Sequence, residues 1–106
     1  MTPTARTLKY LRKANHEAGV VEKWNPHSKT RHDLFGVFDI VAITDDAVVG
    51  IQCTSGSNHS ARVNKMADCA VLWKWLARGC KAEVWSWRKA ANGRYKRRVT
   101  EMELEK

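Results

Sequence analysis

The segment Phe38–Ile43 (FDIVAI) restricts the fold of this chain most, because a single carboxylate interrupts a near-continuous apolar run. Such a run is typical of a strand buried within a sheet. Asp45-Asp46 then predicts a turn, and Val48–Cys53 (VVGIQC) predicts the strand that pairs back. In this hairpin Asp39 and Gln52 would approach each other near the strand ends. We therefore expect a buried hairpin with polar side chains at one end.

Helix and strand patterns flank the hairpin on both sides. Before it we expect a helix over Thr4–Ala18, a short strand over Val20–Trp24 and a polar loop over residues 25–32. After it we expect a helix from about Ser60 to Arg78, a strand over Ala82–Trp87 and, beyond the Asn92-Gly93 turn, a strand over Tyr95–Leu104. The order α-β-β-β-α-β-β predicts an α/β fold, a mixed β-sheet flanked by helices, in one domain over residues 1–106.

The charge of the chain favours a polyanionic partner. Nineteen Lys+Arg residues against 11 Asp+Glu give a net charge of +8. Between Lys74 and Arg98 there are nine basic residues, and Glu83 is the only acidic one. A basic domain without a nucleic-acid partner would have the same composition, but the clustering of the charge favours nucleic acid.

Other features argue against several protein classes. The longest apolar run, Cys69–Trp73, is far shorter than the ~20 residues of a membrane span. No apolar segment follows the first residues, so the sequence predicts no signal peptide, no membrane association and a cytoplasmic location. Cys53, Cys69 and Cys80 form no CxxC pair, which favours reduced, mostly buried thiols and argues against a zinc site.

Asp39 is the residue that most strongly indicates chemistry. A charged side chain within an apolar strand is costly unless it is paired or bound to a metal. Strand alternation places Asp39 on one face with Val41 and Ile43. A divalent cation held by oxygen ligands from Asp39 and Gln52 would fit there. A structural role is the alternative, in which Asp39 caps a loop amide or pairs with Arg31.

These residues resemble the core of the PD-(D/E)XK nuclease superfamily, in which an Asp at a strand end is followed by a D/E-x-K or Q-x-K tripeptide on the next strand. The segment Arg31–Asp39 is similar to the R…G…D approach of archaeal-type Holliday-junction resolvases. Gln52-Cys53-Thr54 is similar to the Q-x-K of Mrr-type restriction endonucleases. The segments DLFGVFDIVAI, IQCTSGSNHSARVNKM and VWSWRK also resemble short uncharacterised proteins of phages and prophages, over about residues 19–99.

The resemblance implies a restriction-endonuclease-like fold and a metal-dependent DNA endonuclease, with branched DNA as a candidate structure-specific substrate. It implies Mg²⁺ or Mn²⁺ as cofactor, with Asp39 and Gln52 as metal ligands and catalytic residues. It also implies a bacterial or phage-infected cell as the location, and a homodimer as a candidate assembly, since small members of this fold often pair.

The sequence departs from the D/E-x-K pattern at two positions, with Gln52 in place of the acid and Thr54 in place of the lysine. Thr54 stands where the motif has its catalytic lysine, which makes Lys65 on the following helix the candidate for a displaced lysine. Arg62, about one helical turn earlier, is an alternative. The third carboxylate of the superfamily matches Glu22 slightly better than Glu17.

Basic residues and tryptophans supply the predicted DNA interface. The predicted contacts are Arg31, His59, Arg62, Arg88, Lys89, Lys96, Arg97 and Arg98. Trp85 and Trp87 share one strand face, and one or two tryptophans could stack on unpaired bases. Two other functions remain open: a catalytically inactive DNA-binding module on the same fold, and a protein-interaction module with an acidic partner.

Overall fold

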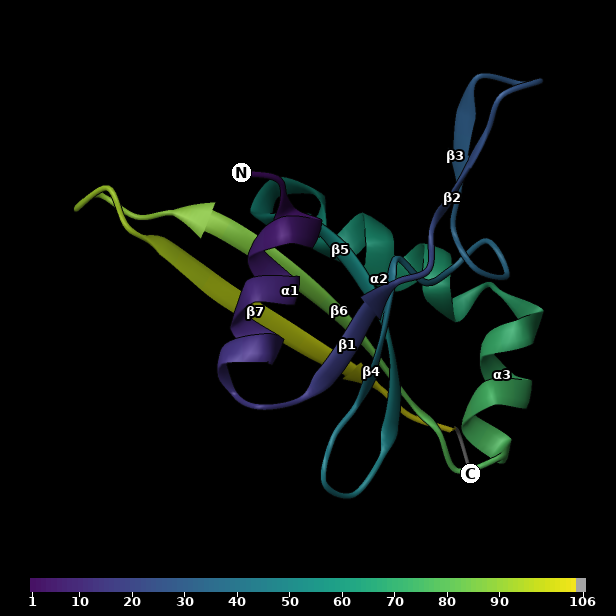
Figure 1. Ribbon diagram of the computed structural model, residues 1–106. Helices are drawn as coiled ribbons and strands as arrows, with labels where there is room; N and C mark the ends of the chain where they lie inside the picture. The colour runs from purple at the N-terminus through teal and green to yellow at the C-terminus, as the bar shows by residue number, and fades with distance from the viewer. Residues whose placement is uncertain (105–106) are drawn as a thin grey trace.

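A five-stranded mixed sheet forms the centre of the computed structural model, which describes residues 1–104 (Figure 1). Its strands are β1 (Glu17–Val20), β4 (Ile40–Ile43), β5 (Val48–Ser55), β6 (Lys81–Lys89) and β7 (Tyr95–Met102), in the order β1-β4-β5-β6-β7. The β5–β6 pair is parallel and the other pairs are antiparallel. The expected α/β class with a mixed sheet is thus confirmed.

Three helices cover the two faces of this sheet (Figure 1). Helix α1 (Pro3–Lys13) lies on one face, whereas α2 (His59–Ala67) and α3 (Ala70–Ala77) form the crossover between β5 and β6 on the other. A short 3-10 turn, η1 (Gly56–Asn58), connects β5 to α2. Among residues 1–104, no helix has the length and apolar character needed to cross a membrane.

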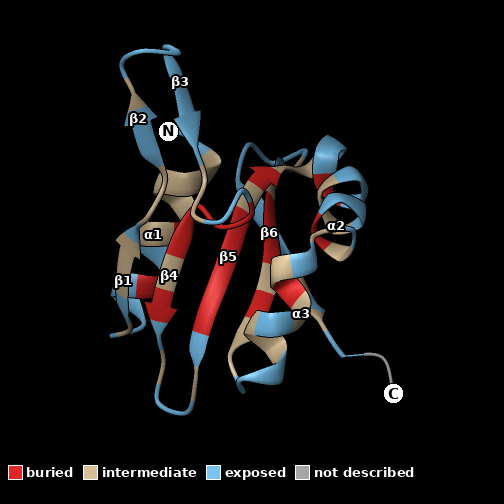
Figure 2. Ribbon diagram, turned by 90° about the vertical axis from the view of Figure 1, so that its right-hand side faces the viewer, coloured by how far each residue is buried: buried red, intermediate tan, exposed pale blue. Residues whose placement is uncertain are grey.

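Each face of the sheet carries its own hydrophobic core, since strand alternation sends successive side chains to opposite sides. Leu11 of α1 packs on Ile40 and Ile51. On the other face, Phe38 packs with Met66 and Leu72 of the crossover helices. Figure 2 shows the buried residues concentrated in β4, β5 and β6. The polar residues near Asp39 therefore lie at one end of the most buried strands.

The first helix is shorter than the sequence predicts. It begins after Thr2, whose Oγ1 accepts a hydrogen bond from the Ala5 amide at 3.1 Å, and it ends at Lys13 rather than Ala18. Asn15 adopts a left-handed conformation with φ of 65°, which reverses the chain. The following residues then form β1, so Glu17 belongs to a strand and not to a helix.

Two further segments differ from the expected elements. The residues of the expected strand Val20–Trp24 and polar loop 25–32 instead form the end of β1, a linker and a separate hairpin of β2 (Lys23–Asn25) and β3 (Thr30–His32). Asn25 Oδ1 accepts the His27 amide at 2.9 Å, which closes the turn between them. The single helix expected over residues 60–78 is interrupted at Cys69, whose ψ of 118° is extended, so that α2 and α3 pack separately.

Gly50 allows the ring of Phe38 to lie directly against β5. A Cβ at Gly50 would lie 2.5–2.7 Å from three ring carbons of Phe38, which is fully buried, so the ring or the strand would have to shift. We expect Gly50→Ala to lower the free energy of unfolding by about 1–3 kcal/mol, measured by urea denaturation. Gly19→Ala is the matched control, because nothing lies within 4 Å of its Cβ position. An equal effect of both substitutions would contradict this account of Phe38.

Candidate functional site

Three carboxylates meet at the start of β4. Glu22, Asp33 and Asp39 each offer one oxygen, and these oxygens lie within 4.8 Å of one another. Glu22 lies between β1 and β2, Asp33 follows β3 directly, and Asp39 immediately precedes β4. We call these three residues the acidic triad. The two ends of the β2–β3 hairpin therefore bring two carboxylates to a third beside the buried core. Figure 2 shows the base of this hairpin next to the start of β4.

Backbone hydrogen bonds hold the acidic triad in place. The Val21 amide donates to the Asp39 carbonyl at 2.9 Å, and the Leu34 amide donates to the Phe38 carbonyl at 2.9 Å. Residues next to Glu22 and Asp33 are thus both tied to the segment that carries Asp39. The triad consequently rests on sheet-like pairing and not on free loops.

Asp39 is buried, with 5% of its surface exposed. Its Oδ2 accepts the Cys53 amide at 2.7 Å and Gln52 Nε2 at 3.1 Å. The predicted approach of Asp39 to Gln52 is therefore confirmed. The sequence left two structural roles open for Asp39. The first, capping a backbone amide, is present, but the amide belongs to Cys53 on the neighbouring strand β5 and not to a loop. The pairing with Arg31 is absent within residues 1–104, since Arg31 Nη1 instead lies 3.1 Å from Glu22 Oε1.

Gln52 bridges two members of the triad. Its Nε2 donates to Asp33 Oδ2 at 3.2 Å and to Asp39 Oδ2 at 3.1 Å. In this arrangement the Gln52 amide positions the two carboxylates as a donor, whereas the predicted metal ligand would be its Oε1. A role as ligand would require the amide to turn so that oxygen replaces nitrogen at the site.

The surroundings of Asp39 disfavour its negative charge. Burial, followed by a hydrogen bond to Asp33, raises the pKa of Asp39 from 3.8 to about 7. The hydrogen bond from the Cys53 amide opposes this rise, and the negative charges of Asp33 and Glu22 contribute smaller parts of it. Carboxylates held together out of water in this way are stabilised by a nearby cation.

The donor set of the acidic triad fits a small divalent cation. Mg²⁺ prefers octahedral oxygen ligands at about 2.0–2.1 Å, so ligand oxygens on adjacent corners are about 3 Å apart and those on opposite corners about 4 Å apart. The triad oxygens lie within 4.8 Å of one another, so they would move closer together to hold the ion. Glu22, Asp33 and Asp39 are the residues that would hold the ion.

Sequence reasoning identified two of the three triad members and missed Asp33. Phe35 and Gly36 have positive φ angles of 57° and 72°, and the Gly36 amide donates to the Asp33 carbonyl at 2.9 Å. This tight turn brings Leu34 beside Phe38 and therefore Asp33 beside Asp39. The Asp-Leu-Phe-Gly sequence over 33–36 was the available signal, because Asp and Gly favour such turns.

The basic residues of α2 that are candidates for the displaced lysine do not contact the acidic triad in the described residues. Lys65 is exposed and Arg62 is partly buried, and neither forms an ion pair or hydrogen bond with the triad in the described part of the chain. The cation in contact with the triad is Arg31, through Glu22. The structure thus brings Arg31, and not Lys65, to the carboxylates.

His59 was predicted to contact DNA, and its burial contradicts that prediction. It is 1% exposed, with Nδ1 2.7 Å from Ser86 Oγ and Nε2 2.7 Å from Thr100 Oγ1. Burial, and secondarily the charge of Arg98, lowers the pKa of His59 and favours the neutral ring. Its observed role is to tie the start of α2 to β6 and β7.

The basic residues of the β6–β7 hairpin divide between the two faces of the sheet. Arg88, Lys96 and Arg98, together with Arg97, line a hollow of about 280 Å³. The guanidinium of Arg97 lies 4.1 Å from the ring centroid of Tyr10, on the α1 face. Lys89 is exposed at the end of β6. The predicted DNA contacts of this hairpin therefore do not all point to one face of the sheet.

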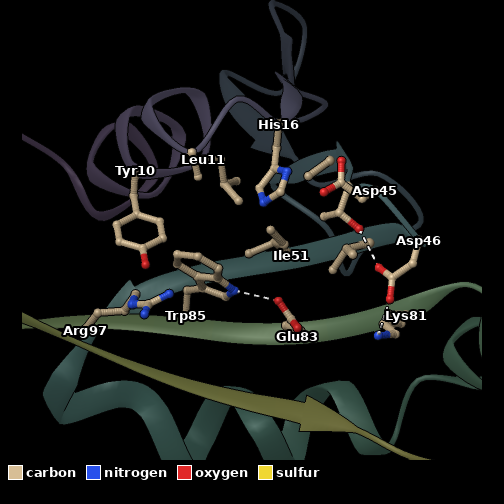
Figure 3. A pocket seen from close by; sticks show the side chains of 14 residues that line it. Tyr10, Leu11, His16, Asp45, Asp46, Ile51, Lys81, Glu83, Trp85 and Arg97 are labelled. Carbon is tan, nitrogen blue, oxygen red and sulfur yellow. Dashed lines mark hydrogen bonds and ion pairs between the residues drawn. The ribbon is translucent and has the colours of Figure 1, made fainter.

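A second hollow, of about 580 Å³, opens beside α1 (Figure 3). Ile51 and Trp85 lie at its base, and His16, Glu83 and Arg97 point toward it. Glu83 accepts a hydrogen bond from Trp85 Nε1 at 2.9 Å. No member of the acidic triad lines this hollow, so it is separate from the candidate metal site.

Comparisons with protein-family models, curated proteins and solved structures give no match for this chain. The chemistry of the site therefore rests on the geometry of the acidic triad and its neighbours.

Proposed function

We propose that this protein is a metal-dependent DNA endonuclease with a restriction-endonuclease-like core. The observation that carries the proposal is the acidic triad of Glu22, Asp33 and Asp39, whose oxygens lie within 4.8 Å of one another. Three adjacent carboxylates repel a phosphate unless a cation lies between them. A cluster of this kind in a chain of net charge +8 supports a metal-assisted reaction on a polyanion.

Each residue near the triad has a distinct role in this proposal. Glu22, Asp33 and Asp39 hold Mg²⁺ or Mn²⁺, and Gln52 fixes the orientation of two of these carboxylates through its amide. A divalent cation at this position would polarise the scissile phosphate and lower the pKa of an attacking water. Arg31, in contact with Glu22, supplies positive charge near the developing charge on the phosphate.

Arg31 could also supply the positive charge that the superfamily motif places on its lysine. Thr54, at the motif lysine position, is 6% exposed and carries no charge. A positive group must then come from another element, and Arg31 on β3 is already in contact with a triad member. Lys65 on α2 remains a second candidate for this positive group. Its side chain would have to reach the bound phosphate without contacting the triad.

The alternative function is a DNA-binding module without catalysis. Gln52 and Thr54 favour this alternative, because they replace the acid and the lysine of the motif. The acidic triad favours catalysis, since an inactive DNA-binding surface gains nothing from three carboxylates beside its basic residues.

A homodimer would present two metal centres to a duplex and permit cleavage of both strands.

The test is cleavage of supercoiled plasmid, single-stranded DNA and a four-way junction in Mg²⁺, in Mn²⁺ and in EDTA. We expect cleavage with either metal and none in EDTA, and we expect Asp33→Ala to abolish it. Asp45→Ala is the matched control, because Asp45 is an exposed acid of the β4–β5 turn outside the triad. Loss of cleavage in Asp45→Ala, or retention in Asp33→Ala, would contradict the assignment. DNA binding without any cleavage would establish the binding module instead.

A further inference from the structure

A groove of about 450 Å³ is lined by residues of α1 and of the β6–β7 hairpin. Helix α1 covers the sheet face opposite α2 and α3 (Figure 1). Four cationic side chains line the groove: Arg6, Lys9 and Lys13 from α1, and Arg94 from the β6–β7 turn. No acidic residue lines it, and α1 contains no Asp or Glu. We call it the α1 groove. Its charge is complementary to a polyanion.

Aromatic rings lie among these cations. Tyr10, Trp87 and Tyr95 line the α1 groove, and the two tyrosines are each 42% exposed. Trp87 is fixed by a hydrogen bond from its Nε1 to Thr7 Oγ1 at 2.9 Å. The guanidinium of Arg6 lies 3.4 Å from the ring centroid of Tyr95. Flat rings and a guanidinium held in place are surfaces on which nucleic-acid bases stack.

The α1 groove is distinct from the acidic triad. Trp87 points to α1, as its bond to Thr7 shows, whereas the adjacent Ser86 bonds His59 on the opposite face. Gln52, which contacts the triad, pairs in register with Val84, and Val84 packs in the core beneath α2 and α3. No triad residue lines the groove. A ligand in the groove would therefore occupy a second site.

We propose that the α1 groove binds single-stranded DNA. Its cations would contact backbone phosphates, and its rings would stack on bases, which a duplex does not offer because its bases are already stacked in pairs. The choice of DNA over RNA rests on the proposed nuclease function; the choice of a single strand rests on the exposed rings. A protein with the acidic triad and this groove would hold an unpaired strand apart from the position of cleavage.

The ring contribution is tested by fluorescence anisotropy with a labelled oligothymidylate of about 12 nucleotides, in EDTA so that no cleavage occurs. Tyr95→Ala should weaken binding about 5-fold to 150-fold, the range expected for loss of one base stack. Tyr95→Phe keeps the ring and should bind as the wild type does. A strand of the same length with abasic sites should show no difference between wild type and Tyr95→Ala. Equal binding by Tyr95→Ala and wild type on oligothymidylate would overturn the proposal.

The cationic contribution is tested by the salt dependence of the same binding. Replacing Lys9 and Lys13 together by alanine should reduce the slope of log K against log salt by about 1.4, which corresponds to two lost phosphate contacts on a single strand. Lys74 and Arg78, exposed and outside the groove, provide the control pair of substitutions. The same slope change in both double variants would show a general charge effect and overturn the assignment to this groove.

Competing duplex DNA and oligouridylate complete the test. Tighter binding of the duplex, with the same sensitivity to Tyr95→Ala, would contradict the choice of a single strand. Tighter binding of oligouridylate would contradict the choice of DNA. Because every measurement is made without metal, failure of the groove leaves the cleavage result unaffected, and failure of cleavage leaves the binding result intact.

Discussion

Asp39→Asn should abolish metal-dependent DNA cleavage while making the metal-free protein more stable at pH 8. The substitution removes the most buried carboxylate of the acidic triad, which would be a metal ligand under the proposed function. Metal-ion assistance contributes several kcal/mol to a transition state, so the rate should fall at least about 100-fold. Initial cleavage rates in saturating Mg²⁺ measure this effect. A reduced affinity for Mg²⁺ should accompany it, measured by calorimetry.

The gain in stability follows from the raised pKa of Asp39. Burial and then Asp33 raise this pKa from 3.8 to about 7, so the ionised carboxylate destabilises the folded protein above that pH. At about 1.4 kcal/mol per pKa unit the penalty is at most about 4 kcal/mol. Asparagine has no charge, retains an acceptor for the Cys53 amide and can donate to Asp33 as a protonated Asp39 would. Urea denaturation in EDTA at pH 8 should therefore show a gain of about 1–4 kcal/mol.

The two effects of Asp39→Asn have opposite signs, which separates a functional role from a structural one. A residue kept for stability alone would lose stability when replaced, and cleavage would fall only with the folded fraction. Asp45→Asn controls for the removal of one exposed negative charge. A variant with reduced stability and unchanged cleavage per folded molecule would refute the metal-site assignment.

The centre of the fold was predictable because its signals are local. The apolar runs around Asp39 and Gln52 and the acidic turn between them define the β4–β5 hairpin, and hairpin register brings the two polar residues together. The net basic charge and the Asn92-Gly93 turn similarly predicted a charged terminal hairpin, which β6 and β7 form. In each case residues close in sequence determine the contact.

The rest of the site depends on contacts between distant segments. Asp33 reaches Asp39 only because the chain turns back at Phe35 and Gly36, where the sequence gives no clear strand pattern. His59 has the polar character of a surface residue, yet the packing of α2 on β6 and β7 buries it between two hydroxyl groups. Arg31 pairs with Glu22, and not with Asp39 as one structural alternative had it, because β2 and β3 pair.

The metal-free protein should become less stable as the pH rises from about 4 to about 7, and Mg²⁺ should reverse this loss. The folded state holds a proton on Asp39 up to about pH 7, whereas the unfolded chain releases it near 3.8. Between these values the folded state binds more protons, so the free energy of unfolding falls with rising pH. At a Mg²⁺ concentration of about 100 Kd, binding adds about 2.7 kcal/mol. Thermal unfolding in EDTA and in Mg²⁺, from pH 4 to 9, measures both effects.

His59 also makes the free energy of unfolding depend on pH, but in the opposite direction to Asp39. Its contribution must therefore be subtracted. Burial and then Arg98 lower its pKa from 6.5, so the folded state binds fewer protons below that pH and its contribution to stability is lost as the pH falls. The difference between wild type and Asp39→Asn cancels this term, because both proteins retain His59. That difference should grow from pH 4 to 7 in EDTA and then level off. In Mg²⁺ it should shrink or change sign at pH 8, since the cation binds the ionised carboxylate. A difference that is independent of pH in EDTA would contradict the raised pKa of Asp39, and a difference insensitive to Mg²⁺ would show that the acidic triad does not bind the metal.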